Sequence, residues 1–261
     1  MRRARAGGAP FPDLLLASLL RDMRTRFGRS YLSYILAIAW PLVHLSVMFG
    51  GYIVTHKVAP IGDEPGVFAF TGLVPYIMCL YPARFTSMTI IQNKPLLNFA
   101  VVKPIHLIAA RAILESLTAL ISFTVFVFVL VAINLVASPD DVYLVAETIG
   151  AILFFSVGYG VFGILIVAIQ PTFGMVFVVL SIVGLYISSG AIMPLTLLSP
   201  NVQEILSYNP LFQAVGLMRS AYFSAFDVSD YSLFYIYLLG FAFLLLGLIS
   251  ERLFRGVIIR V

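Results

Sequence analysis

The most regular feature of the chain is a series of long apolar runs separated by short polar segments. A helix needs about 20 mostly apolar residues to cross the hydrocarbon core of a bilayer. The runs of that length are Tyr31–Val54, Gly66–Ile91, Ile113–Ala137, Leu144–Ile169, Met175–Leu195 and Leu233–Ser250. The pattern predicts an all-α membrane protein with six transmembrane helices. They form one transmembrane domain over residues 1–261, with no soluble domain inserted.

A different pattern occupies residues 12–29, before the first run. Its apolar positions recur at i, i+3, i+4, i+7 and i+11: Leu16, Leu19, Leu20, Met23 and Phe27. Arginines crowd the same stretch: Arg21, Arg24, Arg26 and Arg29. This spacing predicts an amphipathic helix in the membrane surface, with leucines in the acyl boundary and arginines at anionic headgroups. The helix serves either as a simple topology anchor or as a lever that responds to a cytoplasmic partner.

The only long connection, residues 196–232, is too polar to span the bilayer. It still shows helical spacing in two pieces, whose starts are signalled by Ser199-Pro200 and Asn209-Pro210. We expect two short re-entrant helices between the fifth and sixth spans. Irregular backbone at membrane depth is tolerated only against protein or a water-filled cavity, so this loop is predicted to form an outer gate or vestibule.

Composition supports a membrane protein. The chain is 61% hydrophobic and 11% charged, with a mean hydropathy of +1.03. Soluble domains average about 45–50% apolar and about 25% charged residues. Cys79 is the only cysteine, so no intramolecular disulfide is possible. The first run is too long for the core of a signal peptide, and we expect it to be retained as a span.

The positive charges are placed asymmetrically. Of 16 Lys and Arg residues, 13 flank the same side of the predicted spans. They are Arg2, Arg3, Arg5, Arg21, Arg24, Arg26, Arg29, Lys94, Lys103, Arg111, Arg252, Arg255 and Arg260. The positive-inside rule therefore predicts that both termini are cytoplasmic. The net charge of +4 is explained by this placement beside membrane lipid, and we expect no nucleic-acid partner.

Motifs for catalysis are missing from the sequence. There is no G-x-x-x-x-G-K-[ST] stretch, so the chain has no P-loop for ATP. The three histidines are scattered, and no zinc or nucleophile motif occurs, so we expect no metal, no cofactor and no catalytic residue. "GYGVFG" (158–163) fits a dinucleotide fingerprint but lies inside an apolar run. Ser156, Gly160 and Gly163 are better interpreted as small residues that let helices approach closely.

Ionisable residues inside spans are costly and usually functional. No carboxylate falls near the middle of a predicted span, which argues against a proton- or sodium-driven carrier. Arg111 and Glu115 share a helix face at i, i+4 and are predicted to form a salt bridge. Arg84 lies within the second span. It either snorkels to the interface or faces a polar path and attracts an anionic substrate.

Aromatic residues accompany Arg84. Pro75 and Pro82 are expected to kink the second span, and Tyr76, Tyr81 and Phe85 lie beside them. Further tyrosines, including Tyr222, are predicted to lie in the outer half of the membrane or beyond it. One interpretation is an interfacial aromatic belt. The other is a path for sugars, because aromatic faces are apolar surfaces with a polar edge.

Three stretches resemble a known family. "LLRDMRTRFGRSYLSYILAIAWPL" (19–42) resembles the N-terminal signature of membrane subunits of ABC-2-type polysaccharide exporters. "KPLLNFAVVKPIHLIAARAILE" (94–115) is similar to their segment between the second and third spans, and "NPLFQAVGLMRSAYF" (209–223) to their last outer loop. Within the group, the chain is most similar to the capsule-polysaccharide permeases of Gram-negative bacteria.

The resemblance implies a homodimeric channel in the bacterial inner membrane that works with two separate ABC ATPase subunits. ATP and Mg²⁺ would bind only to those subunits. Residues 92–104 would be the coupling segment, or else an ordinary basic loop. The residues implied to face the ATPase are Asn93, Lys94, Leu97, Asn98 and Lys103. The helix at 12–29 would be the interface helix that transmits ATPase motion.

The exported substrate implied by the resemblance is an acidic, lipid-linked capsular polysaccharide. Arg84 and Arg219 would suit its charge, and a periplasmic or outer-membrane partner would receive it. The implied path residues are Arg84, Tyr76, Tyr81, Phe85, Tyr222 and Arg219. The alternatives are an exporter of O-antigen or teichoic acid, a drug or lipid exporter of the same superfamily, an ion-coupled secondary transporter, and a channel or intramembrane enzyme.

Overall fold

The computed structural model describes residues 10–27, 31–55, 64–192, 199–223, 226 and 228–260, and all regular elements in these ranges are helical. The long helices are α2 (Tyr31–Thr55), α3 (Pro65–Ser87), α5 (Pro104–Ala132), α6 (Val142–Ile169) and α10 (Leu233–Leu253). The shorter elements are α1 (Phe11–Phe27), α4 (Thr89–Gln92), η1 (Lys94–Asn98), α7 (Pro171–Ile187), α8 (Pro200–Ser207), α9 (Pro210–Ser220), η3 (Val228–Asp230) and α11 (Arg255–Arg260).

The five long helices are long and apolar enough to cross a membrane, whereas α7 falls short. Met175–Leu195 was the predicted fifth run, but α7 begins at Pro171 and ends at Ile187. Its 17 residues rise about 26 Å, less than the roughly 30 Å of a hydrocarbon core. The helix ends before Gly190, whose φ of 76° is left-handed. A sixth span therefore stays a prediction.

Other helix ends also differ from the apolar runs. The helix expected from Ile113 begins at Pro104, where Pro occupies the first turn and the Lys103 N–H donates to His106 Nδ1 (3.1 Å). The second run is divided between α3 and α4. The two starts predicted in the long connection coincide with α8 and α9, and the side chain of Asn209 caps α9 by accepting from the Leu211 N–H.

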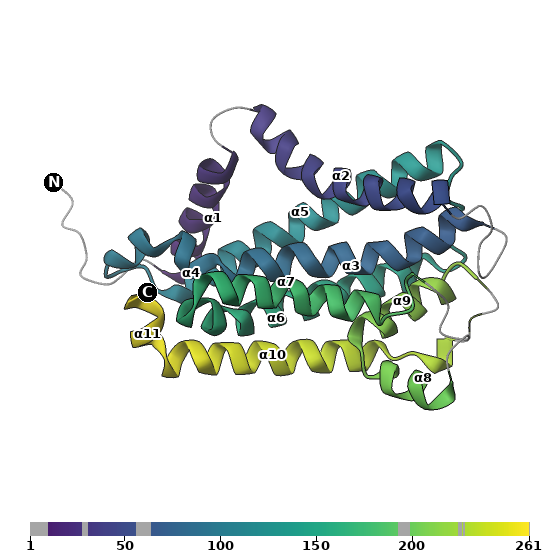
Figure 1. The fold of residues 1–261 in the computed structure, drawn as a ribbon. Coiled ribbons are helices and arrows are strands. Elements are labelled where there is room, and N and C mark those ends of the chain that lie inside the picture. Colours follow the sequence, from purple (N-terminus) through teal and green to yellow (C-terminus); the bar gives the residue numbers. More distant parts are fainter. Residues whose placement is uncertain are drawn as a thin grey trace.

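The long helices run roughly along a common direction, with α3 in the centre, whereas α1 lies across them (Figure 1). Residues 66–83 of α3 are all buried, and α2, α5, α6, α7 and α9 all pack against this helix. Helix α10 packs on the outside of α6. Among the helices that surround α3, the pair α5 and α6 make few contacts with each other, and the pair α2 and α7 make no extensive contact with each other. The central helix is therefore flanked by two gaps in its ring of neighbours.

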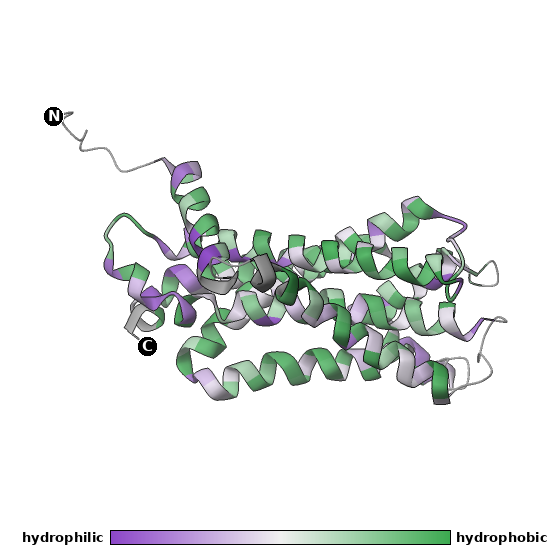
Figure 2. Ribbon diagram, turned by 90° about the horizontal axis from the view of Figure 1, so that it is seen from above, coloured by the Kyte–Doolittle hydropathy of each residue, from purple (hydrophilic) through white to green (hydrophobic). Residues whose placement is uncertain are grey.

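Polarity follows the long axis of the bundle. Its length is mostly hydrophobic, and hydrophilic residues gather at the ends (Figure 2). Helices α1, α4 and α11 lie at one end, and α8 lies at the other (Figure 1). That arrangement agrees with an N-terminal helix and a C-terminal helix on the same side of a membrane, and the cytoplasmic assignment of that side stays a prediction from charge.

Small residues determine how closely α6 approaches its neighbours. The Ser156 hydroxyl donates to the Cys79 carbonyl of α3 at 2.6 Å. A Cβ at Gly160 would meet the Ala83 carbonyl oxygen at 2.7 Å, and one at Gly163 would meet Val178 of α7 at 2.9 Å. The interpretation of this stretch as a helix-packing surface is confirmed.

Candidate functional site

A cavity of about 370 Å³ lies between α2 and α3 at the side where α2 and α7 are apart. Its lining residues are Trp40, Val43, His44 and Val47 from α2 and Leu80, Tyr81 and Arg84 from α3. Leu80 and Tyr81 precede Arg84 by four and three positions, so each lies beside Arg84 on the surface of that helix. The cavity combines apolar walls, aromatic rings and one guanidinium group.

Arg84 supplies the positive charge of this cavity. Its side chain is half-buried, and its Nε makes no hydrogen bond with any described residue. The guanidinium carbon lies 5.5 Å from the centre of the Phe85 ring. No described carboxylate lies within ion-pair distance of Arg84. A desolvated cation of this kind attracts an anion more strongly than an arginine in water would.

Aromatic side chains form the wall around Arg84. The Tyr81 hydroxyl lies 3.1 Å from His44 Nδ1, and the Tyr81 ring stacks on Phe85 with centroids 6.2 Å apart. Trp40 projects from α2 with 67% of its surface exposed. Exposed aromatic faces suit the apolar faces of sugar rings, while the tyrosine, histidine and arginine offer polar groups to hydroxyls and acids.

The structure brings Tyr81, Arg84 and Phe85 together, whereas Tyr222 and Arg219 lie elsewhere. Tyr76 lies behind the cavity wall, with its ring centroid 6.3 Å from that of His44. Tyr76 is buried and stacks on Tyr186 of α7, with ring centroids 4.2 Å apart. Arg219, expected to face the outside, is instead buried at the end of α9. That position was not foreseen because burial of a cation depends on aromatic neighbours from other helices.

The surroundings of Arg219 are well defined. Its guanidinium carbon lies 4.0 Å from the centre of the Phe68 ring, and its Nη2 donates to the Ala191 carbonyl at 3.4 Å. Burial lowers the pKa of Arg219 to about 10, an effect that nearby tyrosines oppose. The group remains charged at neutral pH, so the cation–π contact with Phe68 compensates part of its desolvation.

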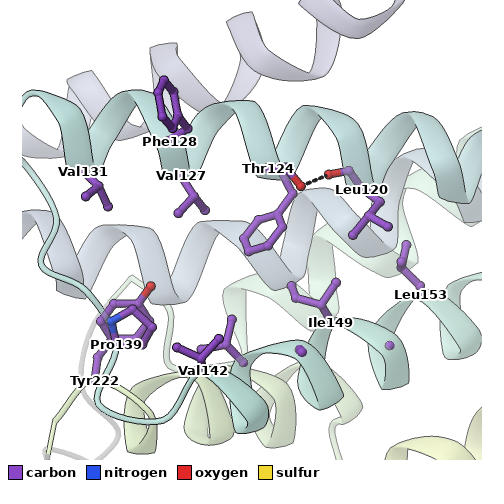
Figure 3. Close-up of a pocket in the computed structure, with 14 residues that line it drawn as sticks. Leu120, Thr124, Val127, Phe128, Val131, Pro139, Val142, Ile149, Leu153 and Tyr222 are labelled. Atoms are coloured by element: carbon purple, nitrogen blue, oxygen red, sulfur yellow. Dashed lines mark hydrogen bonds between the residues drawn. The ribbon is translucent and has the colours of Figure 1, made fainter.

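Tyr222 lines a second, larger cavity of about 720 Å³ in the gap between α5 and α6 (Figure 3). Figure 3 shows Leu120, Val127 and Phe128 on one side and Val142 and Ile149 on the other. The hydroxyl of Thr124 is bonded to the Leu120 carbonyl of its own helix at 2.9 Å. This groove is almost entirely apolar, so it suits an acyl chain better than a sugar.

In the segment 92–104, the structure separates the predicted coupling residues into two groups. Lys94, Asn98 and Lys103 are exposed, and Leu97 is half-buried against the core. Asn93 is only 3% exposed, and its side chain donates to the Thr89 carbonyl and accepts from Arg21. Its side chain therefore faces the protein instead of a docking partner.

The segment also exposes two apolar side chains that the sequence analysis did not single out. Phe99 is 62% exposed, and Val101 is exposed beside it. Large apolar residues in an otherwise polar connection often mark a protein contact. The run of four apolar residues at 99–102, between Asn98 and Lys103, was the available signal.

The predicted surface helix corresponds to α1. Leu16 and Leu20 point away from the bundle, and Ser18 and Asp22 are buried against it. Among the arginines, Arg21 is half-buried, and Arg24 is exposed. The side chain of Arg26 and all of Arg29 lie outside the described residues. The placement of α1 in a membrane surface stays a prediction.

Sequence reasoning missed two residues of the cavity, Trp40 and His44. Trp40 is the only tryptophan of the chain, and His44 is a polar residue in a predicted span. Both were signals, because histidine within an apolar span is uncommon. Their proximity to Arg84 depends on how α2 packs against α3. Within the described residues, no group of three His, Cys, Asp or Glu side chains could hold a metal ion.

Comparisons with known proteins identify the family. No protein-family model matches the chain. The polysialic acid transport protein KpsM of Escherichia coli is 30% identical over 90% of this chain and 91% of its own. The capsule polysaccharide export inner-membrane proteins BexB of Haemophilus influenzae and CtrC of Neisseria meningitidis are 28% and 27% identical, covering 92% and 89% of this chain and 91% and 87% of their own. The chain therefore belongs to the family of capsule-polysaccharide export inner-membrane proteins.

Proposed function

We propose that this chain is the transmembrane permease subunit of an ATP-driven ABC exporter that moves an acidic, lipid-linked capsular polysaccharide across the inner membrane. The observation that carries the proposal is the similarity to capsule-export proteins along nine-tenths of the chain. The permease performs no covalent chemistry itself. Two ABC ATPase subunits bind ATP and Mg²⁺ and supply the energy.

The cavity between α2 and α3 is the part of the structure best suited to the glycan. Arg84 offers a positive charge with no described carboxylate within ion-pair distance, and Trp40 and Tyr81 offer aromatic faces. An acidic sugar requires both kinds of contact. Stacking holds each sugar weakly and without sequence-specific hydrogen bonds, so a polymer slides past instead of being trapped.

A second copy of the chain completes the conduit. Trp40, Val43 and Val47 form an exposed apolar face on α2, and Phe173 and Leu180 extend a similar face on α7. Trp40, Val43 and Val47 also line the cavity, and α2 and α7 have no extensive contact with each other. A homodimer with these faces at its interface encloses the cavity, so that the glycan moves between protein walls instead of lipid.

The contact with the ATPase involves the end of the bundle where α1, α4 and η1 meet. Lys94, Asn98 and Lys103 provide polar and basic groups, and Phe99 and Val101 provide the apolar anchor. A buried aromatic anchor with a charged rim is typical of stable protein interfaces. At the opposite end, α8 exposes Ile205 and Tyr208, which suit a periplasmic export partner.

Transport by the purified complex tests this function. The permease and its ATPase are reconstituted in vesicles, and ATP is added to the side bearing the ATPase. We expect the capsular glycolipid to reach the other side only with hydrolysable ATP. Equal transport in the absence of the ATPase, driven by an ion gradient, would refute the proposal. Competition by O-antigen or teichoic acid lipid precursors distinguishes capsule export from those alternatives.

A further inference from the structure

Three segments of the chain meet at the guanidinium group of Arg111 in α5. Its Nε lies 3.5 Å from Asp22 Oδ2 of α1, and its Nη1 lies 3.3 Å from Glu115 Oε1 one helical turn away. Its Nη2 donates to Gln92 Oε1 at 2.8 Å, at the end of α4. All three guanidinium nitrogens of one arginine therefore contact different residues of α1, α4 and α5. The predicted pair of Arg111 and Glu115 is confirmed, as part of a larger cluster.

A second contact strengthens the junction, as we call the meeting point of α1, α4 and α5 at Arg111. Arg21 Nη1 donates to Asn93 Oδ1 at 2.8 Å, and the same nitrogen lies 3.9 Å from Asp22 Oδ1. The Asn93 amide in turn donates to the Thr89 carbonyl at 3.0 Å. Helix α1 thus contacts the short stretch 89–93 directly at Asn93 and, through Arg111, at Gln92. This stretch leads into the exposed loop of the coupling segment.

Burial makes this junction unusual for a helix that is expected to lie on a membrane surface. The side chains of Asp22 and Glu115 are each 2% exposed, and that of Arg111 is 8% exposed. The face of α1 turned toward the bundle carries the buried Ser18 and Asp22, whereas Leu16 and Leu20 are exposed. Specific ionic contacts therefore contribute to where α1 sits, beside the partial burial of its other leucines. Separating them would leave uncompensated charges in a site shielded from water.

The junction also reaches the candidate site. Glu115 lines a small cavity of about 130 Å³ together with Trp40, Tyr81 and Phe85. Trp40 and Tyr81 also line the larger cavity that contains Arg84. A shift of α5 at Glu115 would therefore change the space directly beside the aromatic wall of the proposed glycan path.

We propose that the buried cluster of Asp22, Arg111 and Glu115 is the link that transmits movement of α1 and of the coupling segment to the cavity at Arg84. The inference rests on the proposed function, in which an ATPase moves these elements. Because one guanidinium group holds all three segments, they move as a unit. The three side chains are positioning residues, since none of them lines the cavity at Arg84.

Neutral substitutions in the host bacterium test the link. Asp22→Asn removes one negative charge of the cluster with almost no change of shape, and Glu115→Gln removes the other negative charge. We expect surface polysaccharide to fall at least tenfold, while the purified complex retains its ATPase subunits and at least half of its ATP hydrolysis. Asp13→Asn is the matched control, because Asp13 is an exposed carboxylate of the same helix. It should export normally.

A double variant tests whether the residues act as one unit. If they do, Asp22→Asn combined with Arg111→Gln should lose no more export than Arg111→Gln alone. Normal export by Asp22→Asn and Glu115→Gln would overturn the inference. So would a loss of export that only parallels a loss of assembled complex, since the cluster would then be structural. Failure of the wild-type complex to couple ATP hydrolysis to export would instead refute the proposed function.

Discussion

Replacing Gly160 by alanine tests the packing on which the whole arrangement of the site depends. A Cβ at this position would lie 2.7 Å from the Ala83 carbonyl oxygen, 2.8 Å from Thr86 Cβ and 3.0 Å from Ala83 Cα. Ordinary contacts begin at about 3.4 Å, and two of these atoms belong to the backbone of the central helix α3. The helices would have to separate, because neither backbone can rotate away.

The expected change in the free energy of unfolding follows from two opposing effects. Overpacking a well-packed interface costs about 1–3 kcal/mol, and contacts with backbone favour the upper end of that range. Alanine regains about 1 kcal/mol over glycine through its greater helix propensity. We therefore expect Gly160→Ala to lower the free energy of unfolding by about 2 kcal/mol. Gly184→Ala is the matched control, because no atom lies within 4 Å of its Cβ position in α7.

The measurement is unfolding of the purified protein in mild detergent by titration with SDS, followed by fluorescence of the single tryptophan. We expect the Gly160→Ala midpoint to shift toward lower SDS and the Gly184→Ala midpoint to stay or rise. Equal midpoints for the two variants would show that α6 does not approach α3 as closely as described, and the position of the cavity would then be in doubt.

Substitutions at three further positions probe the candidate site, the packing of α9 and the contact with the ATPase. Arg84→Gln removes an attraction for an acidic glycan of about 1–4 kcal/mol, so export should fall at least about tenfold with ATP hydrolysis intact. Arg84→Lys should retain more export than Arg84→Gln. Normal surface polysaccharide in the Arg84→Gln variant would remove Arg84 from the path. Asn209→Ala loses the cap on the Leu211 N–H and the bond to the Leu185 carbonyl, and should destabilise by about 2 kcal/mol in SDS unfolding. Asn209→Ser, whose hydroxyl can still cap the helix, should lose less. Phe99→Ser should reduce co-purification of the ATPase, whereas unchanged co-purification would place the contact elsewhere.

Local signals were sufficient for much of the fold. The length and polarity of the apolar runs predicted the five long helices because lipid leaves few alternatives to a continuous helix. The Ser-Pro and Asn-Pro pairs located the starts of α8 and α9, since proline fits the first turn and a polar residue caps it. The residues at which α5 and α7 begin were not predicted. There, Pro104 and Pro171 set the helix starts, whereas the apolar runs begin later in both cases.

The candidate site depended on contacts between distant segments. Arg84, Tyr81 and Phe85 are close in sequence, so their association was predictable, but Trp40 and His44 come from another helix. The family resemblance implied that Arg219 faces the exported substrate on the outer side and that Asn93 faces the ATPase. Their burial depends on Phe68 in one case and on Arg21 in the other. A single sequence records the residue types of such pairs but not their proximity.

The central claim is that an acidic glycan passes along the cavity between α2 and α3 when the ATPase is active. A photo-activatable amino acid at Val43, which lines that cavity, tests it most directly in exporting cells. Phe128, in the apolar groove between α5 and α6, is the matched control position. The account predicts cross-linking to polysaccharide at Val43, lost when the ATPase is inactivated, and none at Phe128. Cross-linking of the glycan at Phe128 and not at Val43 would contradict it.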